Sequence, residues 1–201
     1  MVSRFKNPVR GIIRRLPKRS RRLLKKARRI ARYYRKKGFV VAAEDESTFG
    51  LIPNVAYGWA PKASKPTVTM NYSHKYVNVF AARSSRGFVY MFRVRKTQKD
   101  FIELLKKLLK KWGRVLLFLD NVKTHHGKMV QEFQKKHRKT LKLAFFPKYT
   151  PELNPVEPCW KPGKRALSNR LIKTIDSAKY HLRKTYDQKE NLPKMFKYMQ
   201  N

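Results

Sequence analysis

Two short apolar runs that each lead into carboxylates constrain the fold of this chain most. Phe39 to Ala43 precedes Glu44-Asp45-Glu46, and Val115 to Leu119 ends on Asp120. Short apolar runs of this length, rich in β-branched and aromatic residues, are typical of buried strands. Strands that are neighbours in one sheet would project their terminal acids at the same edge. We therefore expect a sheet that carries an acidic cluster at one edge.

The remainder of the chain after Gly38 supplies the other elements of a mixed sheet. Alternating β-branched and aromatic residues predict strands over 76–83, 87–95 and 141–146, with 67–72 as an irregular lead-in. Apolar residues at helical spacing predict helices over 100–112, 127–137, 155–170 and 176–186. The order β-β-β-α-β-α-β-α indicates an α/β fold: a mixed five-stranded sheet flanked by helices.

Residues 1–38 differ from the rest in composition. Arg and Lys dominate from Arg10 to Lys37, and leucine, isoleucine and alanine recur at i, i+3 and i+4, which predicts one amphipathic helix over about 18–37. One interpretation is a DNA-backbone contact left from a DNA-binding module; the other is a solvated basic arm that is partly disordered in isolation. We divide the chain into a basic helical arm, 1–38, and a folded domain, 39–201.

The charge of the chain identifies its class of partner. Fifty Lys and Arg against twelve Asp and Glu give a net charge of +38, and nucleic acid is the polyanion that best neutralises such a surface. A heat-adapted composition would also enrich Glu, which is scarce here. Cys159 is the only cysteine, which excludes an intrachain disulfide and a multi-cysteine zinc cluster. No apolar run is long enough to span a membrane. These features predict a cytoplasmic, nucleoid-associated protein.

Three acids have the placement that phosphoryl transfer on nucleic acid needs. Two divalent ions held by a few carboxylates can activate the attacking oxygen and stabilise the leaving one. Asp45 and Asp120 stand at the ends of strands, and Glu157 opens a helix that can pack across that edge. Each has a structural alternative: a solvated strand end for Asp45, a turn or helix cap for Asp120, and a favourable helix-dipole contact for Glu157.

A resemblance to a known family attaches to the same residues. Asp120-Asn121 with His125, followed by the segment from Phe146 to Trp160 that contains Tyr-Thr-Pro-Glu-Leu-Asn-Pro-Val-Glu, resembles the transposases of mariner-type insertion sequences. It is most similar to their bacterial and archaeal branch, the insertion-sequence-630 branch. Asp45-Glu46-Ser47 matches the strand end that carries the family's first acid, and Gly58-Trp59 matches a following Gly-Trp element. The resemblance covers roughly residues 39–185.

The resemblance implies an RNase H-like DDE catalytic domain, a transposase that cleaves DNA and transfers strands with Mg²⁺ or Mn²⁺ during transposition. It implies that Asp45, Asp120 and Glu157 are the catalytic and metal-binding triad, with Glu152 ordering the loop. His125 is a candidate for positioning DNA or a group next to the metal ligands. We expect Trp59 and Trp160 to pack against the sheet. Four basic residues after the third acid are candidate phosphate contacts: Lys161, Lys164, Arg165 and Arg170.

Two features depart from the family pattern. Relatives carry one or two helix-turn-helix modules before the catalytic domain, and 38 residues are too few for them. The chain is then a truncated copy, half of a split reading frame or a fragment. The expected partners are double-stranded DNA, as transposon ends and as target, and either a second copy of the chain or a separate chain with helix-turn-helix modules. Second, Pro158 and Pro162 follow Glu157, so we expect the helix to kink or restart near Pro162. Function therefore stays open between an active transposase, an inactive DNA-binding remnant and a structure-selective nuclease.

Overall fold

The computed structural model describes residues 18–52, 54–56, 67–147 and 150–196, which form a five-stranded sheet with helices on both faces. The sheet order is β3-β2-β1-β4-β5. Its strands are β1 (Val40–Gly50), β2 (Tyr76–Ser84), β3 (Gly87–Arg93), β4 (Val115–Leu119) and β5 (Leu141–Phe145). The first three pair antiparallel, and β4 and β5 continue parallel to β1. The predicted adjacency of the two acid-bearing strands is confirmed, because β1 pairs directly with β4.

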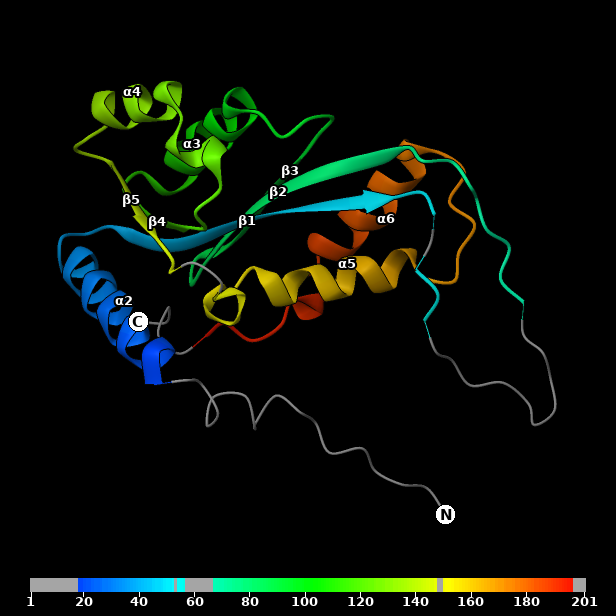
Figure 1. Ribbon diagram of the computed structural model, residues 1–201, viewed down its shortest axis with the longest axis horizontal. Coiled ribbons are helices and arrows are strands. Elements are labelled where there is room, and N and C mark those ends of the chain that lie inside the picture. Colours follow the sequence, from blue (N-terminus) through cyan, green and yellow to red (C-terminus); the bar gives the residue numbers. More distant parts are fainter. Residues whose placement is uncertain (1–17, 53, 57–66, 148–149, 197–201) are drawn as a thin grey trace, which may run out of the picture.

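Helices cover both faces of this sheet. Figure 1 shows α3 and α4 on one face, and α2, α5 and α6 on the other. The helices are α2 (Lys18–Lys36), α3 (Gln98–Trp112), α4 (Lys128–Lys136), α5 (Trp160–Leu167) and α6 (Ile175–Tyr186). Short 3-10 turns lie between them: η2 (Lys123–His126), η3 (Pro151–Leu153), η4 (Glu157–Cys159) and η5 (Lys189–Asn191). No helix in these described ranges is both long and apolar enough to cross a membrane.

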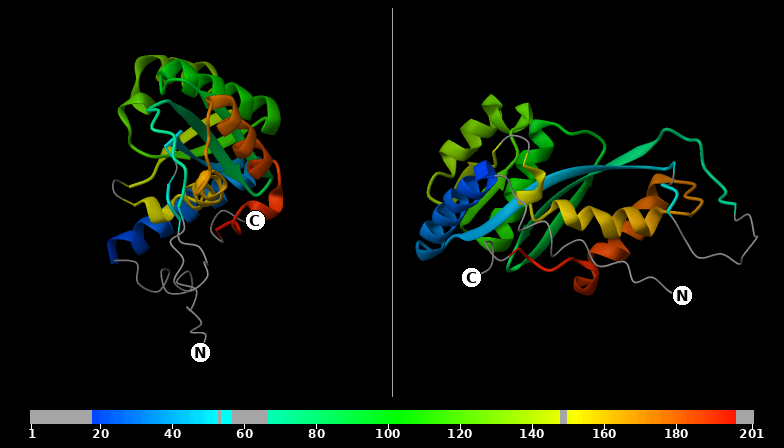
Figure 2. Two further views of the ribbon diagram at one scale, coloured as in Figure 1. Left: turned by 90° about the vertical axis from the view of Figure 1, so that its right-hand side faces the viewer. Right: turned by 60° about the horizontal axis from the view of Figure 1, so that its bottom comes forward.

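Strand β1 extends further than its apolar run predicted. It pairs with β2 from Ala42 opposite Ser84 to Gly50 opposite Tyr76, so the three consecutive acids lie inside the strand and not after it. The antiparallel partner satisfies the backbone of the polar half, which an apolar pattern cannot reveal. The views in Figure 2 show this long β1–β2 pair running beyond the shorter strands β4 and β5.

Alternation along β1 separates two hydrophobic cores. Val40 and Ala42 face α3 and α4 together with Leu117 and Phe101. Val41 belongs instead to the core beneath α2, α5 and α6. Successive side chains of a strand point to opposite faces, so the acids that follow also divide between the two sides of the sheet.

Helix α2 packs its small residues on the sheet and exposes its charges. Ala27 and Ala31 are buried in the core with Phe39, whereas most of the arginines and lysines between them and around them are exposed. The amphipathic helix predicted over 18–37 is confirmed. Leu24, Ile30 and Tyr34 pack against the same core, so α2 presents an apolar stripe to the sheet and its cationic face outward.

The proline-rich segment before α5 differs from the predicted single helix over 155–170. Residues Glu157 to Cys159 form the 3-10 turn η4, and the regular helix begins at Trp160. Pro162 therefore falls in the first turn of α5, where its missing N–H has no intrahelical partner to lose. The predicted break occurs, but it lies at Trp160, and Pro162 does not kink the helix.

Candidate metal-dependent active site

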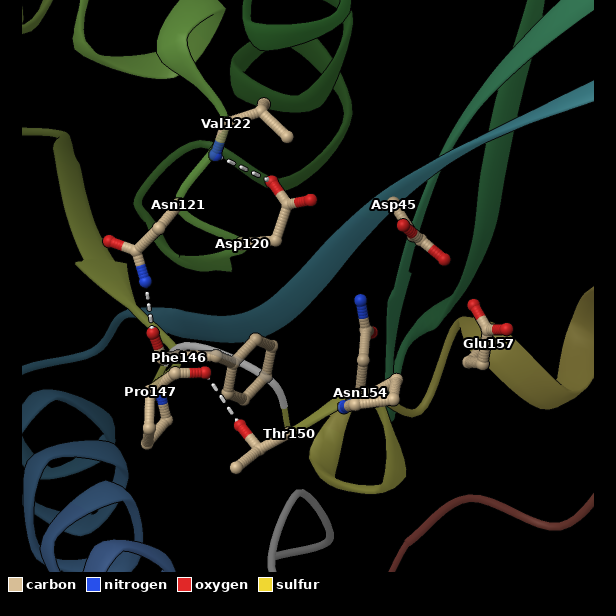
Figure 3. A pocket seen from close by; sticks show the side chains of 10 residues that line it. Asp45, Asp120, Asn121, Val122, Phe146, Pro147, Thr150, Asn154 and Glu157 are labelled. Carbon is tan, nitrogen blue, oxygen red and sulfur yellow. Dashed lines mark hydrogen bonds between the residues drawn. The ribbon is translucent and has the colours of Figure 1, made fainter.

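The three acids line one cavity at the edge where β1 and β4 lie side by side. Figure 3 shows Asp45, Asp120 and Glu157 around this space, which measures roughly 390 Å³. The acids come from the middle of β1, the residue after β4 and the first residue of η4. The other lining residues are Asn121, Val122, Phe146, Pro147, Thr150, Pro151 and Asn154.

Asp45 is the member of the acidic run in β1 that faces the cavity. It lies on the same face of the strand as Val41 and Ala43, and the indole Nε1–H of Trp160 donates to its Oδ2 at 2.7 Å. Burial and the nearby Glu157 carboxyl raise the pKa of Asp45 to about 7, against the Trp160 bond, which lowers it. A buried carboxyl that lies beside a second one presents a site that a cation would neutralise.

Asp120 is the more open of the two strand acids. Its side chain is 47% exposed, and its Oδ1 lies 3.0 Å from Nδ1 of His125. It also accepts a hydrogen bond of 3.4 Å from the backbone N–H of Val122. Partial burial would raise the pKa of Asp120, but the bond and charge of His125 outweigh it, so the pKa is lowered. Asp120 is therefore held as a carboxylate.

The loop that carries Glu157 is fixed to β1 by Asn154. The buried Asn154 side chain donates to the carbonyl of Glu44 at 2.9 Å and accepts from the N–H of Val156 at 3.0 Å. Leu153 and Val156 anchor the same turn in the core. Glu157 itself is exposed and faces the cavity, so the loop is immobilised by its neighbours while its acid stays accessible.

The donor set suits a hard divalent cation. The cavity offers carboxylate oxygens from three separate elements, and Mg²⁺ and Mn²⁺ prefer oxygen ligands with a small number of carboxylates. The position of Asp45, buried beside the Glu157 carboxyl, marks where positive charge would be most stabilised. The residues present thus fit the metal that the sequence predicted.

A second buried acidic group lies behind the cavity and was not anticipated from the sequence. Glu44 and Glu46 point from β1 to the face opposite Asp45, where His125 lies between them. Ligand atoms of the three residues all lie within 4.8 Å of one another. Strict alternation along β1 was the signal that could have found this group, since Glu44 and Glu46 must share a face.

The predicted DNA contacts do not lie in the cavity. Lys161, Lys164, Arg165 and Arg170 are exposed, three of them on α5 and one just after it. His125 is only 2% exposed, so its ring is not placed to meet a phosphate, and the predicted DNA contact does not fit its position. Glu152 is exposed outside the cavity.

The tryptophan predictions have separate outcomes. Trp160 packs against the sheet as predicted, 3% exposed and edge-on to Phe49, but its hydrogen bond to Asp45 was missed. Gly58-Trp59, and Tyr149 of the loop motif, lie outside the described residues.

Comparison with known proteins places the chain in a family. The family model for the DDE superfamily endonuclease matches residues 40–179. This chain belongs to the DDE superfamily of endonucleases. No curated protein sequence matches it significantly.

Solved structures share its fold. The Mos1 transposase paired-end complex with the left transposon end aligns with a TM-score of 0.61 at 19% identity, covering 95% of this chain and 60% of that one. The catalytic domain of Mos1 mariner transposase aligns with a TM-score of 0.59 at 17% identity, covering 88% and 85%. This chain therefore has the RNase H-like fold of a transposase catalytic domain, and it spans about 60% of the longer Mos1 chains.

Proposed function

We propose that this protein cleaves DNA strands and transfers them to target DNA during transposition, in a reaction that depends on Mg²⁺ or Mn²⁺. The observation that carries the proposal is the convergence of Asp45, Asp120 and Glu157 on one cavity. They converge in a chain of net charge +38, in which acids are scarce. Membership of the DDE endonuclease superfamily supports the same reaction class.

In this mechanism the three carboxylates would hold the divalent ions. When bound, such ions would activate the attacking oxygen, of water or of a 3′-hydroxyl, and stabilise charge on the leaving oxygen. Asp120 enters the site ionised because His125 lowers its pKa, and Asp45 must release its proton to bind a cation. The Trp160 N–H holds Oδ2 of Asp45, an acid that lines the cavity.

Double-stranded DNA, as transposon ends and as target, is the proposed substrate. The exposed cations of α5 and α2 lie on the sheet face that also carries Asp45 and Glu157, and phosphates that bind there would release condensed counterions. Two of the solved structures with this fold are Mos1 transposase assemblies described as a paired-end complex with a transposon end and a strand transfer complex. We assign Lys161, Lys164, Arg165 and Arg170 to phosphate contacts on this basis.

We also propose a finer placement within the transposases. The Tyr-Thr-Pro-Glu-Leu-Asn-Pro-Val-Glu segment, from Tyr149 to Glu157, supports the insertion-sequence-630 branch of the mariner-type elements. A homodimer and a separate chain carrying helix-turn-helix modules are the proposed protein partners, and the protein would act in the cytoplasm on the nucleoid.

The test compares Asp120→Asn with the native protein on a labelled DNA duplex bearing candidate transposon ends, with and without Mn²⁺. Loss of cleavage and of saturable Mn²⁺ binding, with DNA binding retained or strengthened, is the expected result. Asp176→Asn is the matched control, because Asp176 is an exposed acid on α6 paired only with Lys179 among its described contacts.

Three other outcomes would decide against the proposal. Native-rate nicking by the Asp120 variant would refute the triad. A native protein without saturable Mn²⁺ binding would be an inactive DNA-binding remnant. Metal-dependent nicking at branched substrates, without any strand joining, would indicate a structure-selective nuclease.

A further inference from the structure

His125 is buried beside the proposed metal site and contacts one of its proposed ligands, Asp120. Its side chain is 1% exposed and lies against Phe101, with ring centroids 4.3 Å apart. It comes from the 3-10 turn η2, five residues after Asp120. A buried imidazole that is packed on one side and directed at a carboxylate has few rotamers available. Its position relative to Asp120 is therefore well determined.

The contacts of Nδ1 show that this nitrogen carries hydrogen. It lies 3.0 Å from Oδ1 of Asp120 and 3.4 Å from the backbone carbonyl oxygen of the same residue. A carbonyl oxygen can only accept, so both contacts require Nδ1 to carry hydrogen. The Nδ1–H group thus contacts both the side chain and the main chain of Asp120. The side-chain contact is made at Oδ1 of Asp120, and Asp120 lines the cavity.

Two further carboxylates face the other side of the ring. Nε2 of His125 lies 3.6 Å from Oε2 of Glu44 and 3.6 Å from Oε1 of Glu46. Glu44 is fully buried, and neither of its oxygens has a hydrogen-bond partner among the described residues. Glu46 also faces the ammonium group of Lys96 at 3.8 Å. The only group of the described structure that faces Glu44 with complementary charge is therefore His125.

We propose that His125 is a positioning residue for the metal ligand Asp120, with Glu44 and Glu46 behind it to fix the ring. The arrangement connects the two faces of β1. Glu44 and Glu46 on one face fix the histidine, and the histidine orients Asp120, which lines the cavity on the other face. The inference rests on the proposed function, because it assumes that Asp120 binds metal. Partners of this kind usually change metal affinity or activity 10- to 100-fold (about one to two orders of magnitude) when removed.

Three substitutions at His125 separate the roles of its two nitrogens. The amide nitrogen of Asn lies near the position of Nδ1, whereas that of Gln lies near Nε2. His125→Asn should therefore keep the grip on Asp120, and His125→Gln and His125→Leu should lose it. His126→Leu is the matched control, because His126 is the next residue of η2, is exposed, and stacks only on Phe145 among its described ring contacts. Circular dichroism and melting temperature verify folding of every variant.

The measurement is Mn²⁺ affinity by calorimetry, together with the Mn²⁺ concentration that gives half-maximal DNA cleavage. We expect both values to stay within about threefold of native for His125→Asn and His126→Leu, and to rise about 10- to 100-fold for His125→Gln and His125→Leu. If His125→Leu does not fold, the comparison of the Asn and Gln variants decides. The Asn variant failing as badly as Gln, or all three keeping native affinity, would overturn the proposal.

Two controls separate this inference from its foundation. If Asp120→Asn leaves Mn²⁺ affinity native, the proposed triad fails. If Asp120→Asn abolishes binding and every His125 variant binds normally, only the positioning role fails. Glu44, Glu46 and His125 are also residues that a metal can bind directly. The double variant Asp45→Asn/Asp120→Asn could still bind one equivalent of Mn²⁺ or Zn²⁺. If the further substitution Glu44→Gln then abolished this binding, His125 would belong to a second metal site and would not be a positioning residue.

Discussion

Gly163 lies at the tightest contact between the helix that follows Glu157 and the helix packed beneath it. A Cβ placed on Gly163 would lie 2.1 Å from the hydroxyl oxygen of Tyr186 and 2.8 Å from its Cζ. Tyr186 is 3% exposed, and it packs against Phe88, Tyr90 and Trp160. The ring therefore has little room to withdraw, and Gly163→Ala must push α5 and α6 apart.

The expected magnitude is a balance of two effects. Replacing Gly by Ala inside a helix favours folding by about 1 kcal/mol. Overpacking of a rigid contact costs about 1–3 kcal/mol, and a 2.1 Å approach to a buried ring places this site at the upper end. We expect a net loss of about 2 kcal/mol, which lowers the melting temperature of a chain of this size by about 4–8 °C. Displacement of α5 would also move Glu157 and reduce Mn²⁺-dependent cleavage.

A double-mutant cycle with Tyr186→Phe tests the cause. The Tyr186 hydroxyl is buried without a hydrogen-bond partner in the described part of the chain, so removing it should cost little. When Tyr186→Phe is already present, Gly163→Ala should lose at least about 1 kcal/mol less stability than it does alone. Lys161→Ala, at an exposed position of the same helix, should change stability by less than about 0.5 kcal/mol. Urea unfolding gives all four values. Gly163→Ala as stable as the native protein, or additive effects in the cycle, would refute the reasoning.

Three further predictions concern the site itself. Burial and the neighbouring carboxyl raise the pKa of Asp45 to about 7. Its protonated form therefore stabilises the metal-free fold at low pH, and this stability is lost as pH rises through about 7. Mn²⁺ should consequently raise the melting temperature more at about pH 8 than at pH 6. Asp45→Asn should abolish this pH dependence, and its persistence would assign it to another group. Asn154→Ala leaves the Glu44 carbonyl and the Val156 N–H without their partner, so it should cost about 1–3 kcal/mol in urea unfolding and weaken Mn²⁺ binding; an unaltered Mn²⁺ affinity would show that this clamp does not hold the site. Lys164→Ala should lower the slope of log DNA affinity against log salt by about 1 without changing Mn²⁺ affinity, and an unchanged slope would remove Lys164 from the DNA interface.

Much of the fold could be predicted because the two sheet faces impose clear patterns. The apolar runs of β1 and β4 are buried on both faces of the sheet, and α3 buries one face of the helix. Burial of these two kinds leaves a direct trace in the sequence. The end of β1 left no such trace. Its polar half is held by pairing with β2, which is a property of two segments about thirty residues apart. The restart of α5 at Trp160 likewise depends on how η4 closes over the core.

The candidate site was predicted in its acids and missed in their supports. Asp45, Asp120 and Glu157 occupy recognisable positions in motifs, and they converge on one cavity. The Trp160 bond to Asp45 and the Asn154 bond to the Glu44 carbonyl join residues more than 100 positions apart. Contacts at that separation follow from the packed fold and not from local spacing. His125 was singled out by motif, but its burial, which decides between DNA contact and support of Asp120, became clear only in three dimensions.

The run Glu44-Asp45-Glu46 makes the register of strand β1 decide which acid faces the cavity. Insertion or deletion of one residue before it would still place a carboxylate at the cavity, but Asp45 would move to the Phe101 side and a glutamate would take its place. In the same step His125 would lose both glutamates and would face the single carboxylate of Asp45. Such a protein would retain its acidic residues and its net charge. The strand face toward the cavity and the face toward His125 would, however, exchange their side chains. The apolar residues Val40 to Ala43 that precede the run therefore set which acid meets the metal, although none of them lines the site.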